Sequence, residues 1–279
     1  MRILVSHETV YRYATPVTRV IQALRVTPRS HEGQHVVNWR IDVSEDCRLD
    51  AKEDAFGNVT HSFTTDNPLH ELSVLVTGEV ETQDTHGIVR GAVERFPPSL
   101  YLRSTPLTEA DPAIHEFALS LGGDAEANPL DLLHALLRRV HEEVAYDTDP
   151  THAATTAAEA FALRRGVCQD LAQIFIAAAR NRGIPSRYVG GYLHCAEGGD
   201  ASNAGHAWVE SFVGDLGWIA FDPAHCICAT DAHVRVAVGL DYLGAAPVRG
   251  TRFGGEGERL AVSVRVDRSL NQTQNQTQS

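Results

Sequence analysis

The spacing of apolar residues changes from strand-like to helix-like near the middle of the chain, and this change narrows the possible folds more than any other feature. Up to about residue 82, β-branched and aromatic residues form short runs, some of which alternate with polar positions as half-buried strands do. Turn signals such as Thr15-Pro16 and Asn67-Pro68 separate these runs. Several short strands at this spacing predict a β-sandwich-like domain over residues 1–82.

Helical periodicity begins after a connector, which covers residues 83–110. One apolar stripe starts at Leu130, and a second helix is predicted over residues 167–182, where Gly183 and Pro185 end it. The order of these helices and the strands after them predicts an α+β core over residues 111–268. Residues 269–279 form a polar, low-complexity tail that we expect to be disordered. The expected strands cover residues 187–189, 206–213, 218–222, 234–238 and 260–266.

Composition indicates a globular protein and argues against nucleic acid as a partner. Of the 279 residues, 43% are hydrophobic and 22% are charged, which is close to the globular average. The formal net charge is -12, and no cluster of Lys and Arg is large enough to overcome the resulting repulsion from phosphates.

Neither a membrane partner nor export is expected. No apolar run approaches the roughly 18 residues that a bilayer requires, and the first residues turn polar too early for a signal peptide. The five Cys residues are odd in number and scattered, unlike a disulfide framework. We therefore expect a cytoplasmic protein in a reducing compartment, and the sequence leaves the oligomeric state open.

Cys168 stands where a turn containing Gly166 enters the second predicted helix. A thiol in the first turn of a helix lies near unpaired N–H groups and the positive end of the helix dipole, which stabilise its thiolate. The same N–H groups can bind the oxyanion that forms when a thiolate attacks a carbonyl. The alternative is a small core residue, because free Cys is often buried.

A reactive Cys needs a base and a group that orients the base, and His206 and Asp222 are the candidates. In a hairpin of regular register, Asp222 lies opposite Val209, on the wrong face. A one-residue shift, through a three-residue loop or a bulge, moves Asp222 opposite Trp208 and within side-chain reach of His206. We therefore predict an irregularity within residues 214–217.

Taken together, these segments resemble the transglutaminase-like superfamily, in particular its bacterial branch of cysteine peptidases. In the predicted core, the resemblance covers residues 165–170, 182–192, 206–210 and 217–223, in that order. Outside it, residues 7–13 and 54–58 resemble the N-terminal β domain of these proteins, and residues 235–242 resemble their C-terminal segment.

The resemblance implies a papain-like fold, in which a catalytic helix packs on an antiparallel sheet. It also implies a role for each residue of the triad: Cys168 as nucleophile, His206 as general base and then acid, and Asp222 as the orienting carboxylate. Such a triad forms an acyl-enzyme thioester without any cofactor. The Cys168 N–H is an expected oxyanion donor, and no second donor is identified.

Three functions remain open. The first is a thiol hydrolase that cleaves an amide bond of a peptide or protein, either peptide or isopeptide. The second is an acyltransferase with the same triad, because water access and the acceptor site distinguish the two. The third is a catalytically idle binding module, which the complete triad makes the least favoured.

The sequence departs from the family pattern after Pro223. The family commonly continues Thr-Asn-Gly, whereas this chain has His225, Cys226 and Cys228 over residues 224–228. This difference affects one edge of the expected pocket and therefore the substrate preference. Together with His194 and Cys195, these residues offer zinc-ligand types, but their spacing is not that of the usual Cys-x2-Cys pairs, so we expect no metal site. A calcium-gated crosslinker is not expected either, because no Asp-rich calcium loop is present.

Overall fold

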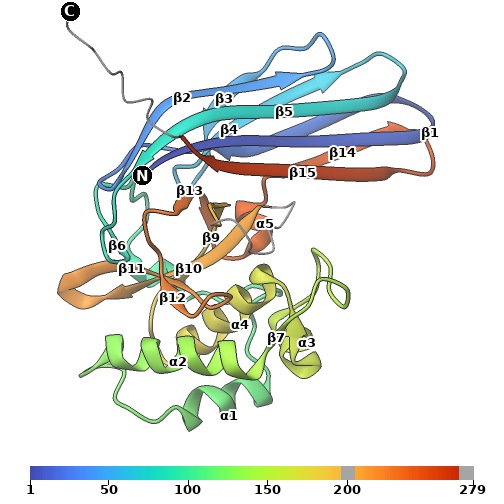
Figure 1. The fold of residues 1–279 in the computed structure, drawn as a ribbon. Helices are drawn as coiled ribbons and strands as arrows, with labels where there is room; N and C mark the ends of the chain where they lie inside the picture. Colours follow the sequence, from blue (N-terminus) through green and yellow to red (C-terminus); the bar gives the residue numbers. More distant parts are fainter. Residues whose placement is uncertain (196–204, 270–279) are drawn as a thin grey trace, which may run out of the picture.

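A long antiparallel sheet lies above a smaller sheet that is flanked by helices (Figure 1). The computed structural model describes residues 1–195 and 205–269. The mixed α+β class and the strand-rich N-terminal region are as predicted. The predicted disordered tail lies outside the described residues, apart from Ser269.

The upper sheet is organised by β1 (Arg2–Thr27), which pairs along both of its edges. One edge carries β5 (Leu69–Thr82) and then β4 (Val59–Thr65), and the main strand order is β2-β5-β1-β4-β3. β2 spans Gln34–Val43 and β3 spans Asp50–Glu53. The sheet has its own apolar core, in which Leu24 of β1 packs with Phe63 of β4 and Leu72 of β5.

The other edge of β1 carries β14 (Val248–Gly254) and β15 (Arg259–Arg268). The sequence assigned residues 111–268 to the core, and this boundary is wrong for the last two strands. Their alternating pattern correctly predicts a strand near residues 260–266, but alternation does not determine which sheet a strand joins. β14 and β15 follow one another along this edge of β1, both antiparallel to it, so the chain returns to the N-terminal sheet and covers an edge that would otherwise be unpaired.

The lower sheet has the order β12-β11-β10-β9-β13. Four helices pack on or near it: α1 (Pro112–Ser120), α2 (Pro129–Glu143), α3 (Ala157–Leu163) and α4 (Cys168–Asn181). α5 (Tyr242–Ala245) follows the last core strand. None of the helices in the described residues is long and apolar enough to span a membrane. The strands are β9 (Ser186–Leu193), β10 (His206–Val213), β11 (Gly217–Asp222), β12 (Ile227–Cys228) and β13 (His233–Gly239).

The predicted connector over residues 83–110 is partly built into the core. Its β6 (Ile88–Val89) pairs with β11, and a short 3-10 helix, Pro98–Leu102, buries Tyr101. Two further short strands, β7 (Ala145–Tyr146) and β8 (Arg165–Gly166), pair in parallel just before α4.

One end of the N-terminal sheet also contributes to the apolar core around the helices. Ile3 and Val5 of β1 belong to the same buried cluster as the helix α4 and Val234 of β13. α4 is buried along almost its whole length, which fixes its first turn relative to both sheets. The N-terminal sheet can therefore contribute to a site at the start of α4.

Candidate active site

Cys168 is the first residue of α4, as the sequence predicted, and its exposed fraction is 8%. The first turn is held by Asp170, whose carboxylate accepts hydrogen bonds from the Val167 N–H at 2.8 Å and the Thr151 hydroxyl at 2.7 Å. Gly166 is required beside it, because a Cβ at this position would lie 2.6 Å from the Asp170 side chain. Burial raises the pKa of Asp170 despite these hydrogen bonds.

The hairpin of β10 and β11 has the register that the sequence required. Val213 pairs with Gly217, and Val209 pairs with Phe221, so the next position places Asp222 opposite Trp208. The turn is the three-residue 3-10 segment Gly214–Leu216. The predicted irregularity is therefore confirmed, and it brings Asp222 to the face of His206.

His206 contacts both other residues of the predicted triad. Its Nε2 lies 2.7 Å from Asp222 Oδ2, and the Cys168 thiol lies close enough to the ring to affect its pKa. Because Nε2 donates to the carboxylate, Nδ1 is the nitrogen that remains for the thiol. Burial alone lowers the pKa of His206, but the interactions with Asp222 and Cys168 outweigh burial and raise it to about 10.

Asp222 has more hydrogen-bond donors than a triad requires. Its Oδ2 also lies 2.9 Å from His225 Nδ1 and 3.1 Å from His233 Nε2. Its Oδ1 accepts from the backbone N–H of Ala224 at 3.0 Å. Burial alone raises the pKa of Asp222, but the three histidines outweigh it and hold that pKa well below its usual value. We call Asp222 with His206, His225 and His233 the Asp222 cluster.

The orientation of His233 is determined by the backbone. The Thr230 N–H donates to His233 Nδ1 at 3.1 Å, so this nitrogen carries no proton and Nε2 is the one that donates to Asp222. His233 is 6% exposed, whereas the side chain of His225 is 45% exposed. His233 is thus a fixed donor, and His225 lies at the surface of the same cluster.

The sequence did not identify His225 or His233 as site residues. His225 follows Asp222 by three positions, and that spacing in the departure from the family pattern was the only available signal. His233 begins β13, a strand with no motif around it, and reaches Asp222 only through the arrangement of the sheet.

One group in the described residues has metal-ligand types close enough to hold an ion: His206, Asp222 and His225, whose ligand atoms lie within 4.8 Å of one another. Cys195, Cys226 and Cys228, which the sequence offered as zinc ligands, do not belong to it. The histidine nitrogens already serve as hydrogen-bond partners of Asp222. We therefore assign these contacts to the orientation of the triad.

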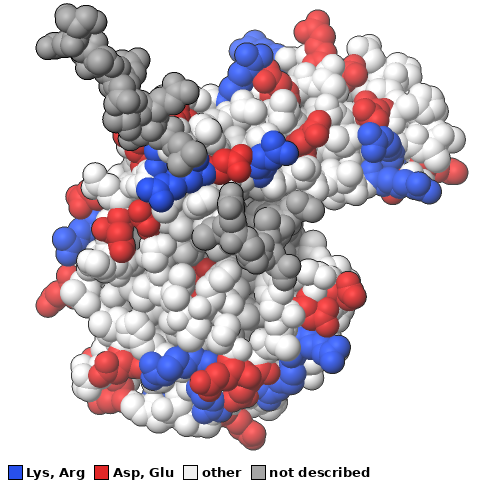
Figure 2. All heavy atoms as spheres, viewed as in Figure 1, with Lys and Arg blue, Asp and Glu red and all other residues white. Residues whose placement is uncertain are grey.

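A cavity of about 550 Å³ opens beside Cys168 and His206. Its walls come from both sheets, with Tyr188 and Tyr192 of β9 on the core side and Leu260 and Val262 of β15 on the other. Figure 2 shows the molecule hollowed between the N-terminal sheet and the core. A thiol, an imidazole and a cavity large enough for a ligand thus occur together at the start of α4.

Comparisons with known proteins agree with this arrangement. The family model described as the bacterial transglutaminase-like N-terminal region matches residues 3–81, and that of the transglutaminase-like superfamily matches residues 120–223. The second match includes Cys168, His206 and Asp222.

Individual relatives extend along the chain to different degrees. An uncharacterized protein of Mycobacterium leprae is 29% identical over 96% of this chain and 99% of its own length. A protein-glutamine gamma-glutamyltransferase of Pseudomonas aeruginosa is 32% identical, but over 47% of this chain and 22% of its own length. The solved structure of a "Putative Cysteine Protease from Cytophaga hutchinsonii" has a TM-score of 0.75 at 20% identity, covering 97% of this chain and 92% of that one, which is a likeness of fold.

Proposed function

Because the chain belongs to the transglutaminase-like superfamily, we propose that it is a thiol-dependent hydrolase that cleaves an amide or isopeptide bond of a peptide or protein. The observation that carries the proposal is the series Asp222, His206 and Cys168, in which Asp222 is hydrogen bonded to His206 and the Cys168 thiol interacts with the same ring. It ends beside a cavity large enough for several substrate atoms on both sides of a scissile bond. The three residues act as nucleophile, base and orienting carboxylate, respectively.

In the first half of the reaction, Cys168 Sγ bonds to the carbonyl carbon while its proton is held by His206. The carbonyl π electrons move to oxygen, and when they return the C–N bond breaks. His206 gives its proton to the departing amine, and a thioester remains on Cys168. In the second half, water loses a proton to His206 and attacks the thioester, which releases a carboxylic acid and restores the thiol.

The developing oxyanion would be bound at the start of α4. The N–H groups of Cys168 and Gln169 donate no hydrogen bond to any described residue, because no carbonyl precedes them in the helix. Both residues line the cavity. Unpaired N–H groups that point toward a carbonyl oxygen stabilise its negative charge without any rearrangement.

An acyltransferase is the second candidate, and the partial match to the Pseudomonas aeruginosa protein-glutamine gamma-glutamyltransferase favours it. The chemistry is identical up to the thioester, after which an amine replaces water. We further propose that the enzyme works in the cytoplasm, where reducing conditions keep the Cys168 thiol from oxidation.

Alkylation followed by mass spectrometry tests the nucleophile. We expect iodoacetamide at pH 6 to modify Cys168 before the other four cysteines, and Cys168→Ala to remove the fast reaction. Cys228→Ala is the matched control and should leave the rate unchanged. Cys228 is a half-buried free thiol in β12, at the edge of the core sheet that carries His206 and Asp222. Equally fast alkylation of the Cys168→Ala variant would exclude the assignment.

A fluorogenic peptide and isopeptide library then separates the two candidates. Hydrolysis predicts release of free acid even when an amine is added in excess. Partition of the acyl group to the amine, with little acid formed, would favour the acyltransferase.

A further inference from the structure

The cavity beside Cys168 is almost free of charge in a protein that carries a net charge of -12. No Asp, Glu or Lys is among the described residues that line it. Arg25 is the one permanently charged side chain in that lining, and its Nε is paired with Asp54 at 2.9 Å.

Three polar side chains on one part of the wall are hydrogen bonded to one another. His7 of β1 contacts the Tyr192 hydroxyl through Nδ1 at 3.0 Å and the Thr9 hydroxyl through Nε2 at 3.2 Å. Burial lowers the pKa of His7 to about 4, so its ring is neutral at pH 7. A charged substrate group that lies against this part of the wall would therefore lose its hydration without gaining an ion pair.

The remaining surface of the cavity is apolar and unusually accessible. Leu260 and Val262 of β15 line the cavity and are 57% and 38% exposed. Tyr146 of β7 lines it from the core side and is 50% exposed. In Figure 1, β15 lies in the upper sheet and β7 beside α3 in the helical part, so these side chains come from opposite sides of the hollow.

Two glycines of β9 form a part of the cavity wall that has no side chains. Gly190 and Gly191 both line the cavity, and Gly191 pairs with His206. A Cβ at Gly191 would lie 2.1 Å from the Val234 carbonyl oxygen, so the strand cannot carry a side chain there. Gly190 is the glycine whose missing side chain widens the cavity, because a Cβ there would lie next to Ala245 and Tyr188, which also line it.

We propose that this cavity binds an uncharged aromatic or large aliphatic side chain of the substrate next to the scissile amide, with β15 of the N-terminal sheet as its outer wall. This inference rests on the proposed function, because the cavity's continuity with the Cys168 thiol identifies its occupant as the substrate. Burial of such a side chain against Leu260 and Val262 supplies the binding energy, and this apolar wall favours it over a charged side chain, which would lose its hydration there. The N-terminal sheet is then a specificity element of the enzyme.

Two peptidyl acyloxymethyl ketones that differ only in Phe or Glu beside the ketone test the substrate class. The rate constant for modification of Cys168 should be at least about tenfold higher for the Phe reagent, which corresponds to about 1.4 kcal/mol of discrimination. Equal rates for the two reagents would overturn the proposal.

Val262→Glu and Leu260→Glu test the wall itself. Each should lower the rate with the Phe reagent by about tenfold, because each places a charge against the apolar side chain. Alkylation by iodoacetamide, which is too small to need the wall, should not change. Phe253→Glu is the matched control: Phe253 is a 51% exposed residue of the neighbouring β14 that does not line the cavity. An equal loss in that control would mean that the whole sheet, and not the wall, had been disturbed.

Binding to the Cys168→Ala variant separates this proposal from the proposed function. Fluorescence anisotropy with labelled peptides that contain Phe or Glu at the same position requires no chemistry. A preference for the Phe peptide that Val262→Glu removes supports the subsite even if no amide is cleaved. Failure of wild-type alkylation together with preferential Phe binding would contradict the hydrolase alone, and equal binding of both peptides would contradict the subsite alone.

Discussion

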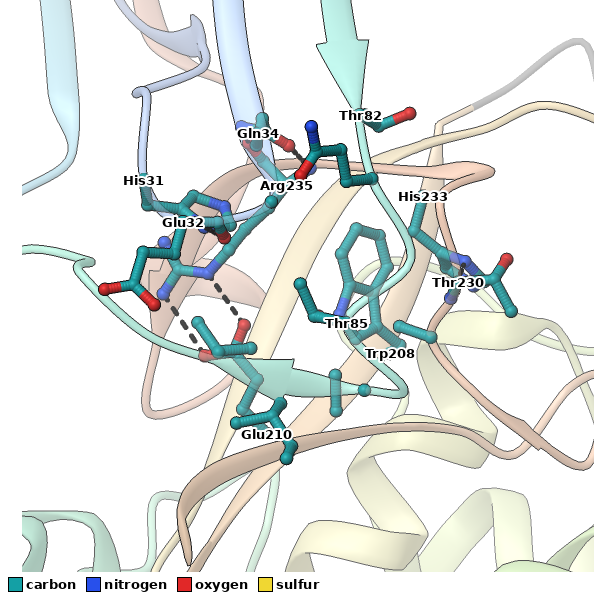
Figure 3. Close-up of a pocket in the computed structure, with 17 residues that line it drawn as sticks. His31, Glu32, Gln34, Thr82, Thr85, Trp208, Glu210, Thr230, His233 and Arg235 are labelled. Atoms are coloured by element: carbon teal, nitrogen blue, oxygen red, sulfur yellow. Dashed lines mark hydrogen bonds and ion pairs between the residues drawn. The ribbon is translucent and has the colours of Figure 1, made fainter. Parts of the chain in front are cut away.

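Two fully buried carboxylates lie on neighbouring strands of the core sheet, and their partners differ in kind. Asp222 of β11 faces three histidines. Glu210 of β10 faces two arginines: its Oε2 lies 2.7 Å from Arg187 Nε, and its Oε1 lies 2.7 Å from Arg235 Nε. Figure 3 shows the Glu210 and Arg235 pair. We call Glu210, Arg187 and Arg235 the Glu210 cluster.

The two clusters respond differently to protons because guanidinium stays charged whereas imidazole can exchange its proton. Burial alone raises the pKa of Glu210, but Arg235 and Arg187 outweigh it and lower it to about 2. The Glu210 cluster links β9, β10 and β13 as a permanent set of charges. The Asp222 cluster holds one movable proton on His206, next to a thiol. Similar burial thus accompanies a fixed ion-pair network in one cluster and, under the proposed function, the catalytic proton transfer in the other.

The largest expected effect comes from removing the charge of Asp222. Asp222→Asn should reduce hydrolysis by about four orders of magnitude, as loss of the orienting carboxylate does in serine protease triads, because His206 then adopts the wrong tautomer. Steady-state kinetics on a cleaved library peptide measures it. Circular dichroism must show an unchanged fold, and retention of more than a tenth of the wild-type rate would contradict the assigned role.

Breaking the Glu210 cluster should affect stability first. Glu210→Gln leaves Arg187, whose side chain is 0% exposed, with one carboxylate partner fewer, and removal of one member of a buried ion pair costs about 3–5 kcal/mol. Urea unfolding measures the loss. Alkylation of Cys168 in the folded fraction should stay near the wild-type rate, and a selective loss of alkylation without a loss of stability would reverse the comparison.

The two clusters should lose their contributions to stability at opposite ends of the pH range. The pKa of His206 is raised from 6.5 to about 10, so its contribution is fully present below about 6.5 and is lost as the pH rises through about 10. The pKa of Glu210 is lowered from 4.5 to about 2, so its contribution is present above about 4.5 and is lost as the pH falls through about 2.

Urea unfolding at a series of pH values gives the free energy of unfolding as a function of pH. We call its decline at high pH the alkaline limb and its decline at low pH the acidic limb. His206→Ala should flatten the alkaline limb alone, and Glu210→Gln should flatten the acidic limb alone. A variant that flattens the opposite limb would show that the charges are assigned to the wrong clusters.

The smallest expected effect distinguishes the two additional histidines. His233→Ala removes a buried hydrogen bond to Asp222, worth about 1 kcal/mol, and should lower the hydrolysis rate about fivefold. His233→Gln, which can place an amide N–H near the former Nε2, should restore part of that loss. His225→Ala is the exposed counterpart and should change the rate less. A larger effect at His225 than at His233 would identify the surface histidine as the more important support.

The difference between the clusters also shows which site residues can be predicted from the sequence. Cys168, His206 and Asp222 were located because each depends on local structure: a helix start, a strand start and the register of one hairpin. The one-residue shift at Gly214–Leu216 follows from alternation, since side chains on adjacent strands meet only on a common face.

The sequence by itself determined the α+β class, the helix that carries the thiol and the hairpin that carries its partners. Only the tertiary structure decided that His233 reaches Asp222, that Arg187 and Arg235 share Glu210, and that β15 returns to line the cavity. The physical reason is that sequence patterns report local structure, whereas these contacts join segments far apart in the chain. Periodicity states which face of a strand is buried, whereas the choice of neighbouring strands depends on pairing energies between segments far apart in the chain.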